Sequence, residues 1–247
     1  MYSESHCHLR GASKESVSKA EEAGLELILA AGIDVESSAE AVSAANRHDS
    51  VKGCVGIHPW RADIFSPGAL EELRELSLEP EVIAISEIGL DFYGRRTAEW
   101  ESTDEVVDPN IQRKSMRAQI TLAVQRELPV LVHDRTPTVE VLDTLEETGV
   151  LKVGAAIHGF FKGPVYARRC VEMGVYLSIG KRTIEQGEEH FLEAVRQTPL
   201  EWLLTETDTG EPAGVVVVAE RIAELKGVSK EEVGRVTTEN LRRLIGL

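Results

Sequence analysis

The sequence contains little cysteine: Cys7, Cys54 and Cys170 are the three among 247 residues. They lie far apart and form no CxxC pair, which excludes a disulfide scaffold or a cysteine-based zinc module as the organising principle. The apolar runs, such as 27–33 and 213–219, are too short to cross a bilayer. No basic, apolar leader opens the chain either. We therefore expect a cytoplasmic protein without a membrane partner.

Basic charge is also scarce. The chain has 27 Lys and Arg residues against 42 Asp and Glu residues, a net charge of −15. A field of this sign opposes broad, non-specific binding to DNA or to an anionic membrane. A small anionic or nucleic-acid substrate stays open if cations hold it locally. The sequence implies no stable protein partner and leaves the oligomeric state open.

A Gly-rich phosphate loop of the dinucleotide or P-loop type is absent after the first predicted strand. Short apolar runs alternate with amphipathic stretches along the chain, which predicts a parallel sheet. We expect strands at 1–7, 26–32, 51–57, 82–88, 129–133, 153–157, 175–179 and 202–205. We expect helices at 13–23, 37–48, 67–76, 110–127, 138–147, 164–173, 189–197, 214–226 and 230–244.

Eight such units indicate a (β/α)₈ TIM barrel, a single domain over 1–247 with an extra C-terminal helix. A doubly wound open sheet is the structural alternative, and the missing phosphate loop disfavours it. The charged stretch 94–108 interrupts the rhythm after the fourth strand. We interpret it as an insertion at the end of the barrel where loops carry function.

Polar residues follow the apolar runs at the carboxyl ends of the predicted strands. They are His6, His8, His58, Glu87, His133, His158 and Asp208. Singly, each has a structural explanation, since a histidine at a strand end is often just hydrogen-bonded. Together they would meet at one rim of a barrel, where burying them without a compensating cation is costly. We interpret Glu87 as the last residue of its strand.

The spacing of His6 and His8 is the sharpest local signal. Side chains alternate along a strand, so both imidazoles face one way, about 7 Å apart, and can close on a single metal ion. Cys7 then points towards the helices, as a packed apolar residue. His190 falls on a predicted helix, and we assign it to the surface.

At this point the chain resembles the TatD-like metal-dependent hydrolases of the amidohydrolase superfamily. The resemblance is carried, in the family's order, by Ser5-His6-Cys7-His8-Leu9, Gly56-Ile57-His58-Pro59, Ser86-Glu87-Ile88-Gly89-Leu90-Asp91-Phe92-Tyr93, Leu128-Pro129-Val130-Leu131-Val132-His133, Ile157-His158-Gly159-Phe160, Thr205-Glu206-Thr207-Asp208 and Glu239-Asn240-Leu241-Arg242-Arg243-Leu244. It covers nearly the whole chain. The chain departs from the family's usual pattern at Glu4, at Gly159 with the residues after it, and at 209–212.

The resemblance implies a hydrolase with two divalent metal ions and the activity of a DNase or a related phosphodiesterase. One ion would be held by His6, His8 and Asp208 and the other by His133 and His158, with Glu87 bridging them. His58 would contact the substrate phosphate. Imidazoles with carboxylates suit zinc, with Mn, Co, Fe or Mg as alternatives.

A carboxylate that touches a metal-activated water can accept its proton, so Asp208 is the expected catalytic base. Glu206 is either a partner that orients a ligand or a structural salt-bridge residue. The predicted rim also carries basic residues suited to phosphate: Arg61, Arg95, Arg96, Arg135, Lys162, Lys181 and Arg182. Aromatic residues nearby could stack on bases: Trp60, Phe92, Tyr93, Trp100, Phe160 and Phe161.

Two other functions compete with a phosphodiesterase. The same metal chemistry serves hydrolases of amides, esters or lactones, and fold and metal together do not choose between these substrates. A non-catalytic barrel that binds a metal or a ligand is the third reading.

Overall fold

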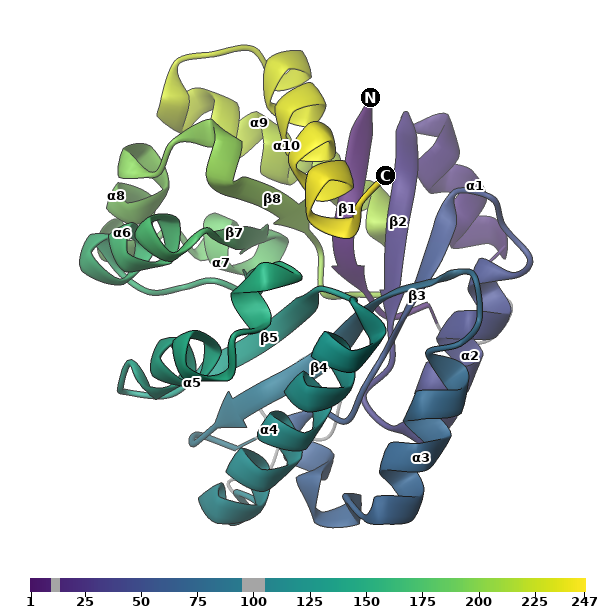
Figure 1. Cartoon of the computed structure of the whole chain (residues 1–247). Helices are drawn as coiled ribbons and strands as arrows, with labels where there is room; N and C mark the ends of the chain where they lie inside the picture. Colours follow the sequence, from purple (N-terminus) through teal and green to yellow (C-terminus); the bar gives the residue numbers. More distant parts are fainter. Residues whose placement is uncertain (10–13, 95–104) are drawn as a thin grey trace.

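Eight parallel strands follow one another around a barrel in the computed structural model, which describes residues 1–9, 14–94 and 105–247 (Figure 1). Each strand pairs in parallel with the next one along the chain. The strands are β1 (Tyr2–Cys7), β2 (Leu25–Ala31), β3 (Val51–Val55), β4 (Val82–Asp91), β5 (Val130–Arg135), β6 (Ala155–His158), β7 (Val175–Gly180) and β8 (Leu203–Glu206).

The barrel closes between β8 and β1. The backbone N–H of Asp208 donates to the carbonyl of His6 at 3.0 Å, and that of His8 donates to the carbonyl of Thr209 at 3.0 Å. The Thr205 hydroxyl donates to the carbonyl of Ser3 at 2.8 Å. These bonds bring the residue that follows the last strand beside the histidines of the first.

Helices surround the strands and connect their ends (Figure 1). They are α1 (Lys14–Glu22), α2 (Val35–Ala45), α3 (Pro67–Leu76), α4 (Pro109–Arg126), α5 (Glu140–Thr148), α6 (Pro164–Met173), α7 (Lys181–Gln186), α8 (Glu189–Gln197), α9 (Val215–Lys226) and α10 (Lys230–Ile245). Short 3₁₀ turns lie at η1 (Pro59–Ile64), η2 (Val150–Lys152), η3 (Leu200–Trp202) and η4 (Pro212–Gly214). None of the helices in the described part of the chain is long and apolar enough to cross a membrane.

The apolar residues divide between the inside of the barrel and the layer between strands and helices. Along β2, Leu27 and Leu29 belong to one cluster and Ile28 to the other, as the alternation of a strand requires. The cluster of Leu27 and Leu29 is the one inside the barrel, and it also includes Leu241 and Leu244 of α10. The extra C-terminal helix therefore packs these apolar residues against the inside of the barrel.

The structure confirms the predicted (β/α)₈ barrel and excludes the open doubly wound sheet. The placement of Glu87 at the end of its strand is wrong, because β4 continues for four residues and pairs Gly89 to Asp91 with β5. Helix α7 was not expected, since its six residues are too few to show an apolar period. Of the expected insertion at 94–108, residues 95–104 lie outside the described residues.

Asn240 ties the C-terminal helix to the start of β8. Its buried side-chain amide donates to the carbonyls of Leu200 at 2.9 Å and Leu203 at 2.8 Å. We predict that Asn240→Ala lowers the free energy of unfolding by about 1–3 kcal/mol, because two carbonyls lose their donor. Urea denaturation measures it. Glu239→Ala, which breaks only an exposed pair with Arg235, serves as the control and should cost less than about 1 kcal/mol. Equal losses in the two variants would contradict the prediction.

Candidate metal centre

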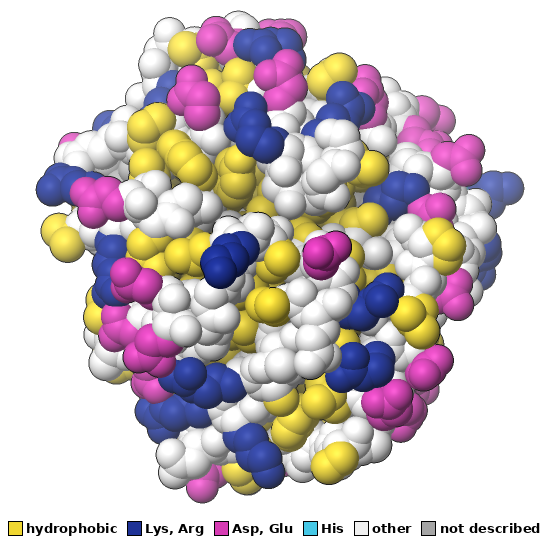
Figure 2. Space-filling view, viewed as in Figure 1, with side chains coloured by type: hydrophobic (Ala, Val, Ile, Leu, Met, Phe, Trp, Pro, Cys, Tyr) yellow, Lys and Arg dark blue, Asp and Glu magenta, His cyan; other side chains and the backbone are white. Residues whose placement is uncertain are grey.

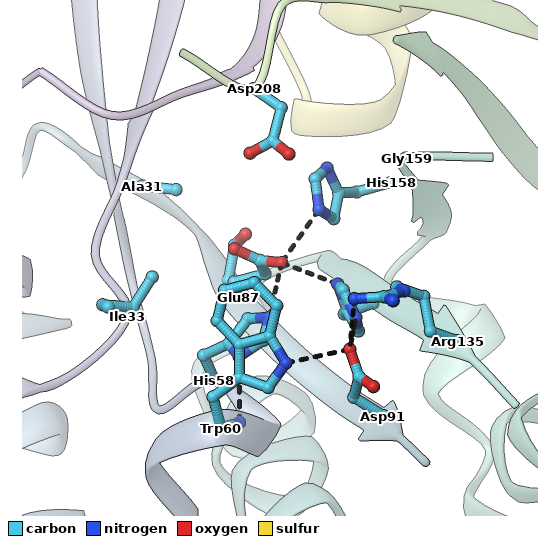
Figure 3. Close-up of polar contacts among 12 residues, drawn as sticks. Ala31, Ile33, His58, Trp60, Glu87, Asp91, Arg135, His158, Gly159 and Asp208 are labelled. Atoms are coloured by element: carbon cyan, nitrogen blue, oxygen red, sulfur yellow. Dashed lines mark hydrogen bonds and ion pairs between the residues drawn. The ribbon is translucent and has the colours of Figure 1, made fainter. Parts of the chain in front are cut away.

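Five imidazoles surround one buried carboxylate, that of Glu87. Figure 3 shows two of them, His58 and His158, directed at it. Its Oε1 atom lies 3.0 Å from His58 Nε2, 2.9 Å from His133 Nδ1 and 2.8 Å from His158 Nε2. Its Oε2 atom lies 3.2 Å from His6 Nε2 and 3.8 Å from His8 Nε2. The two oxygens thus face two different sets of imidazoles.

The strand register delivers these groups. His133 on β5 is the register partner of His158 on β6, so their side chains lie side by side. Glu87, Gly89 and Asp91 occupy alternate positions of β4 and share one face. Strand β4 pairs with β5 at Gly89 and His133.

Gly89 makes the approach of these two strands possible. Its φ is +142°, and a Cβ atom at this position would lie 1.9 Å from the carbonyl oxygen of His133. On the other side, a Cβ atom on Gly56 would lie 2.8 Å from the carbonyl carbon of Ser86. Because these two positions are glycines, the neighbouring backbone segments can lie close to the strand that carries Glu87.

Asp208 reaches the centre from the turn after β8. Its φ is +56°, a left-handed conformation that aspartate tolerates better than most residues. Its Oδ1 atom lies 3.1 Å from His8 Nε2 and 3.8 Å from His6 Nε2, while 44% of the side chain is exposed. The carboxylate thus faces both the imidazoles and the solvent.

Three of the imidazoles use their second nitrogen in the same way. His8 Nδ1 donates to the carbonyl of Ala31 at 3.0 Å, since a carbonyl can only accept. His133 Nε2 lies 2.9 Å from the carboxylate of Asp91, and His158 Nδ1 lies 3.1 Å from that of Glu206. With these N–H groups directed outward, the opposite nitrogen of each ring faces Glu87 or Asp208. Such outer acceptors are typical of histidines that bind metal ions.

His58 has the opposite arrangement. It precedes η1 as its N-cap, and its Nδ1 atom accepts the backbone N–H of Trp60 at 2.9 Å. Burial lowers the pKa of His58 to about 4, so the ring is neutral at neutral pH. Its single proton is then on Nε2, which donates to Glu87. An Nε2 atom that carries a proton has no lone pair for a metal ion.

The electrostatics favour positive charge at this centre. Burial alone would raise the pKa of Glu87, but His58, His158 and His6 hold it well below its usual value. Burial would likewise raise the pKa of Asp208, yet the hydrogen bond from His8 and the charge of His158 bring it to about 2. Both carboxylates are therefore negative at neutral pH and attract cations.

The donor atoms are close enough to share a cation. Those of His6, Glu87, His158 and Asp208 lie within 4.8 Å of one another, as do those of His58, Glu87 and His133. His6 Nε2 is buried and has no hydrogen-bond partner among the described residues. By distance alone, His58 could be a metal ligand together with Glu87 and His133. The proton on its Nε2 atom argues against this role. The remaining donors, imidazole nitrogens and carboxylate oxygens, fit a transition metal such as zinc.

The sequence pattern of the TatD related DNase family matches residues 4–246. The chain belongs to this family. The metal-dependent hydrolase YabD of Bacillus subtilis is 32% identical over 99% of this chain and 98% of its own length. The human deoxyribonuclease TATDN3 is 30% identical over 97% of this chain and 92% of its own. The crystal structure of YJJV, a TatD homologue from Escherichia coli K12, superposes with a TM-score of 0.86 at 24% identity and covers 100% of this chain and 98% of its own. The predicted family is confirmed, and the chain is a TatD-family metal-dependent hydrolase.

A cavity of about 430 Å³ opens above the metal centre of this TatD-family protein. Its lining includes Trp60, Arg135, Phe161, Arg182 and His190. His190 is 54% exposed and contacts the carbonyl of Phe161, so the expected surface residue stands at the rim of the cavity. The size is typical of small-molecule sites.

The predicted rim cations do not all face the cavity. Arg135 and Arg182 line the cavity. Lys162 instead pairs with the buried carboxylate of Asp134 at 2.8 Å and lies over the ring of Tyr166, which makes it structural. Arg95 and Arg96, together with the aromatic Trp100, lie outside the described residues.

Three acidic residues near the centre add to the sequence interpretation. Glu206 contacts His158 and accepts the backbone N–H of Gly159 at 2.7 Å, which agrees with its expected role as a partner that orients a ligand and not with a salt bridge to a basic residue. Asp91 was missed, although its position four residues after Glu87 on one strand face could have signalled it. Glu4 is fully buried and accepts from the backbone of His6, and only the folded barrel shows this contact.

Proposed function

We propose that this TatD-family hydrolase is a phosphodiesterase of the deoxyribonuclease type that uses two divalent cations. His6, His8 and Asp208 would hold one ion. His133 and His158 would hold the other, with Glu87 bridging. The observation that carries the proposal is that His8, His133 and His158 direct one N–H outward and the opposite nitrogen towards a carboxylate.

The two oxygens of Glu87 support its bridging role, since Oε2 faces His6 and His8 whereas Oε1 faces His133 and His158. Imidazole-rich ligand sets favour zinc over magnesium or calcium. Glu206 would act as a positioning residue, because its contact with His158 Nδ1 holds Nε2 towards Glu87.

Two features favour a phosphodiester as substrate. His58 and Arg135 both line the cavity beside the metal centre, and an imidazole N–H and a guanidinium are donors suited to phosphoryl oxygens. The human relative of similar length is named a deoxyribonuclease. Arg135 is anchored to Asp91 at 3.0 Å, which preorganises its planar group.

Bound cations would lower the pKa of a water molecule and neutralise charge on the phosphoryl oxygens. Asp208, negative at neutral pH and open to solvent, accepts the proton of the attacking water. The neutral His58, whose pKa burial lowers to about 4, directs its Nε2–H at Glu87. Once cations occupy the oxygens of Glu87, this N–H would be free to donate to a phosphoryl oxygen instead. Arg135 orients the phosphate from the cavity wall.

We predict that the purified protein, reconstituted with zinc or manganese, retains about two equivalents of metal, as in two-metal hydrolases. It should then hydrolyse bis(p-nitrophenyl) phosphate and a single-stranded oligodeoxynucleotide. Elemental analysis and absorbance assays measure both properties, and p-nitrophenyl acetate is the ester control. Preference for the acetate would instead indicate an ester hydrolase. Two retained equivalents without any turnover would indicate a binding barrel.

His58→Ala separates substrate contact from metal binding. We expect this variant to keep the wild-type metal content, because the protonated Nε2 of His58 cannot ligate. Its kcat/KM for the phosphodiester should fall by about 100-fold, the scale for losing one donor to a developing oxyanion. His158→Ala is the matched control and should lose metal. If His58→Ala lost a full equivalent, His58 would be a ligand.

Asp208→Asn keeps the shape and one ligating oxygen but removes the basic carboxylate. Metal content should fall only in part, whereas turnover should drop by at least ~100-fold. Glu206→Gln is the comparison variant and should lose less, because Glu206 contacts His158 rather than the water. Near-normal turnover of Asp208→Asn would place the base elsewhere, and Glu206 would be the first residue to consider.

A further inference from the structure

Asp91 gathers three side-chain N–H groups on a single oxygen atom (Figure 3). Its Oδ2 atom lies 2.9 Å from His133 Nε2, 2.9 Å from the indole nitrogen of Trp60 and 3.0 Å from Nη1 of Arg135. Its Oδ1 atom accepts the backbone N–H of Tyr93 at 2.9 Å. The carboxylate is fully buried. A carboxylate offers about four acceptor positions, and the number of donors around Asp91 matches this.

The backbone of Asp91 is fixed as firmly as its side chain. Gln112 of α4 accepts the backbone N–H of Asp91 at 2.8 Å and donates to its carbonyl at 2.8 Å. The amide of Gln112 thus holds this end of β4 from the outside of the barrel. Asp91 is a rigid acceptor, and its three donors must adjust to it.

The three donors all reach the cavity, whereas Asp91 is not among the described residues that line it. His133 belongs to the metal centre, and Trp60 and Arg135 form the adjoining wall. Trp60 comes from η1 after β3, while His133 and Arg135 are two positions apart on β5. One buried oxygen therefore connects the metal centre with the wall beside it.

We propose that Asp91 is a positioning residue that couples His133 to a substrate-binding pair formed by Trp60 and Arg135. The proposal rests on the proposed phosphodiesterase function and adds the residues that position the substrate. By accepting Nε2–H, Asp91 leaves His133 Nδ1 as the nitrogen that faces Glu87. By accepting from the indole and the guanidinium, it holds a planar ring and a planar cation at fixed positions on the wall.

This pair suits a phosphodiester that carries a planar ring next to its phosphate, such as a nucleobase or an aryl group. The guanidinium pairs with phosphate oxygens, and the indole offers a face for stacking, worth roughly 1–3 kcal/mol for a base. Among the described residues, Arg135 donates hydrogen bonds to Asp91 and to the carbonyl of Gly94, and both come from Nη1. The remaining N–H groups of the guanidinium are then the ones that serve the ligand.

Asp91→Asn tests the coupling, because an amide has one acceptor oxygen and its NH₂ group opposes the donors around it. We expect zinc affinity at one of the two sites to fall about 10–100-fold. Long-range ¹H–¹⁵N spectra of the zinc-free protein at about pH 9, above the ordinary imidazole range, should show His133 losing its single Nε2–H tautomer. KM for bis(p-nitrophenyl) phosphate should rise as well.

Asp134→Asn is the matched control, since it makes the same change in the neighbouring buried carboxylate. Asp134 contacts Lys162, Thr136 and Tyr166 and none of the imidazoles, so this variant should leave the tautomer of His133 unchanged. Trp60→Leu removes one donor from Asp91 and also the aromatic face. It should raise KM for the diaryl substrate and preserve both zinc affinities.

Three outcomes would overturn the proposal. In Asp91→Asn, an unchanged His133 tautomer with unchanged zinc affinity would remove Asp91 from the metal centre. In Trp60→Leu, an unchanged KM would remove the indole from the substrate wall, and this variant decides the point even if Asp91→Asn does not fold. An equal change of the His133 tautomer in Asp134→Asn would show that the effect comes from a general loss of packing and not from the contact with Asp91. If the wild-type protein cleaves no phosphodiester, the proposed function fails, while the spectra and zinc titrations still decide the contact with His133.

Discussion

Burying the negative charge of Glu87 inside a closed barrel costs on the order of several kcal/mol unless positive or polar groups surround it. The fold answers this cost with five imidazoles, drawn from β1, β5, β6 and the turn after β3. None of these segments could supply the set alone. Closure between β8 and β1 is equally necessary, because it brings Asp208 to His8 across the seam. The site therefore exists only when the whole barrel is formed.

The side chains that meet at Glu87 are the part that the sequence predicts well. Apolar runs locate the strands, and a barrel places the ends of all strands on one rim, so His6, His133, His158 and Asp208 could be gathered without coordinates. The proton on His58 could not be predicted in this way, because it depends on one backbone N–H from Trp60. The three hydrogen bonds to Asp91 depend on the extension of β4 beyond Glu87. The pattern of apolar residues does not show this extension. Chain-wide periodicity thus identifies the groups, and local hydrogen bonds decide what each of them can do.

The distribution of charge limits how such a protein can hold an anionic substrate. Figure 2 shows acidic and basic side chains interspersed over one face of the molecule, and the whole chain carries a net charge of −15. Attraction for phosphate must then be local, at the cations within the cavity. Arg135 and Arg182 line that cavity. Lys162, in the loop after β6, instead forms an ion pair with Asp134. A count of basic residues near strand ends would overestimate the charge available to a ligand.

The contact between Gly89 and the carbonyl of His133 has a consequence for how this site can diversify. A single methyl group would overlap the oxygen at 1.9 Å, so the spacing of β4 and β5 is set by main-chain atoms alone. Residues on the rim can be exchanged to suit another substrate, and the loops can lengthen or shorten. The backbone spacing of the two strands that carry Glu87 and His133 cannot be widened or narrowed by a side chain at Gly89. Selection or design can therefore change the residues that line the cavity far more freely than the spacing of β4 and β5 at the metal centre.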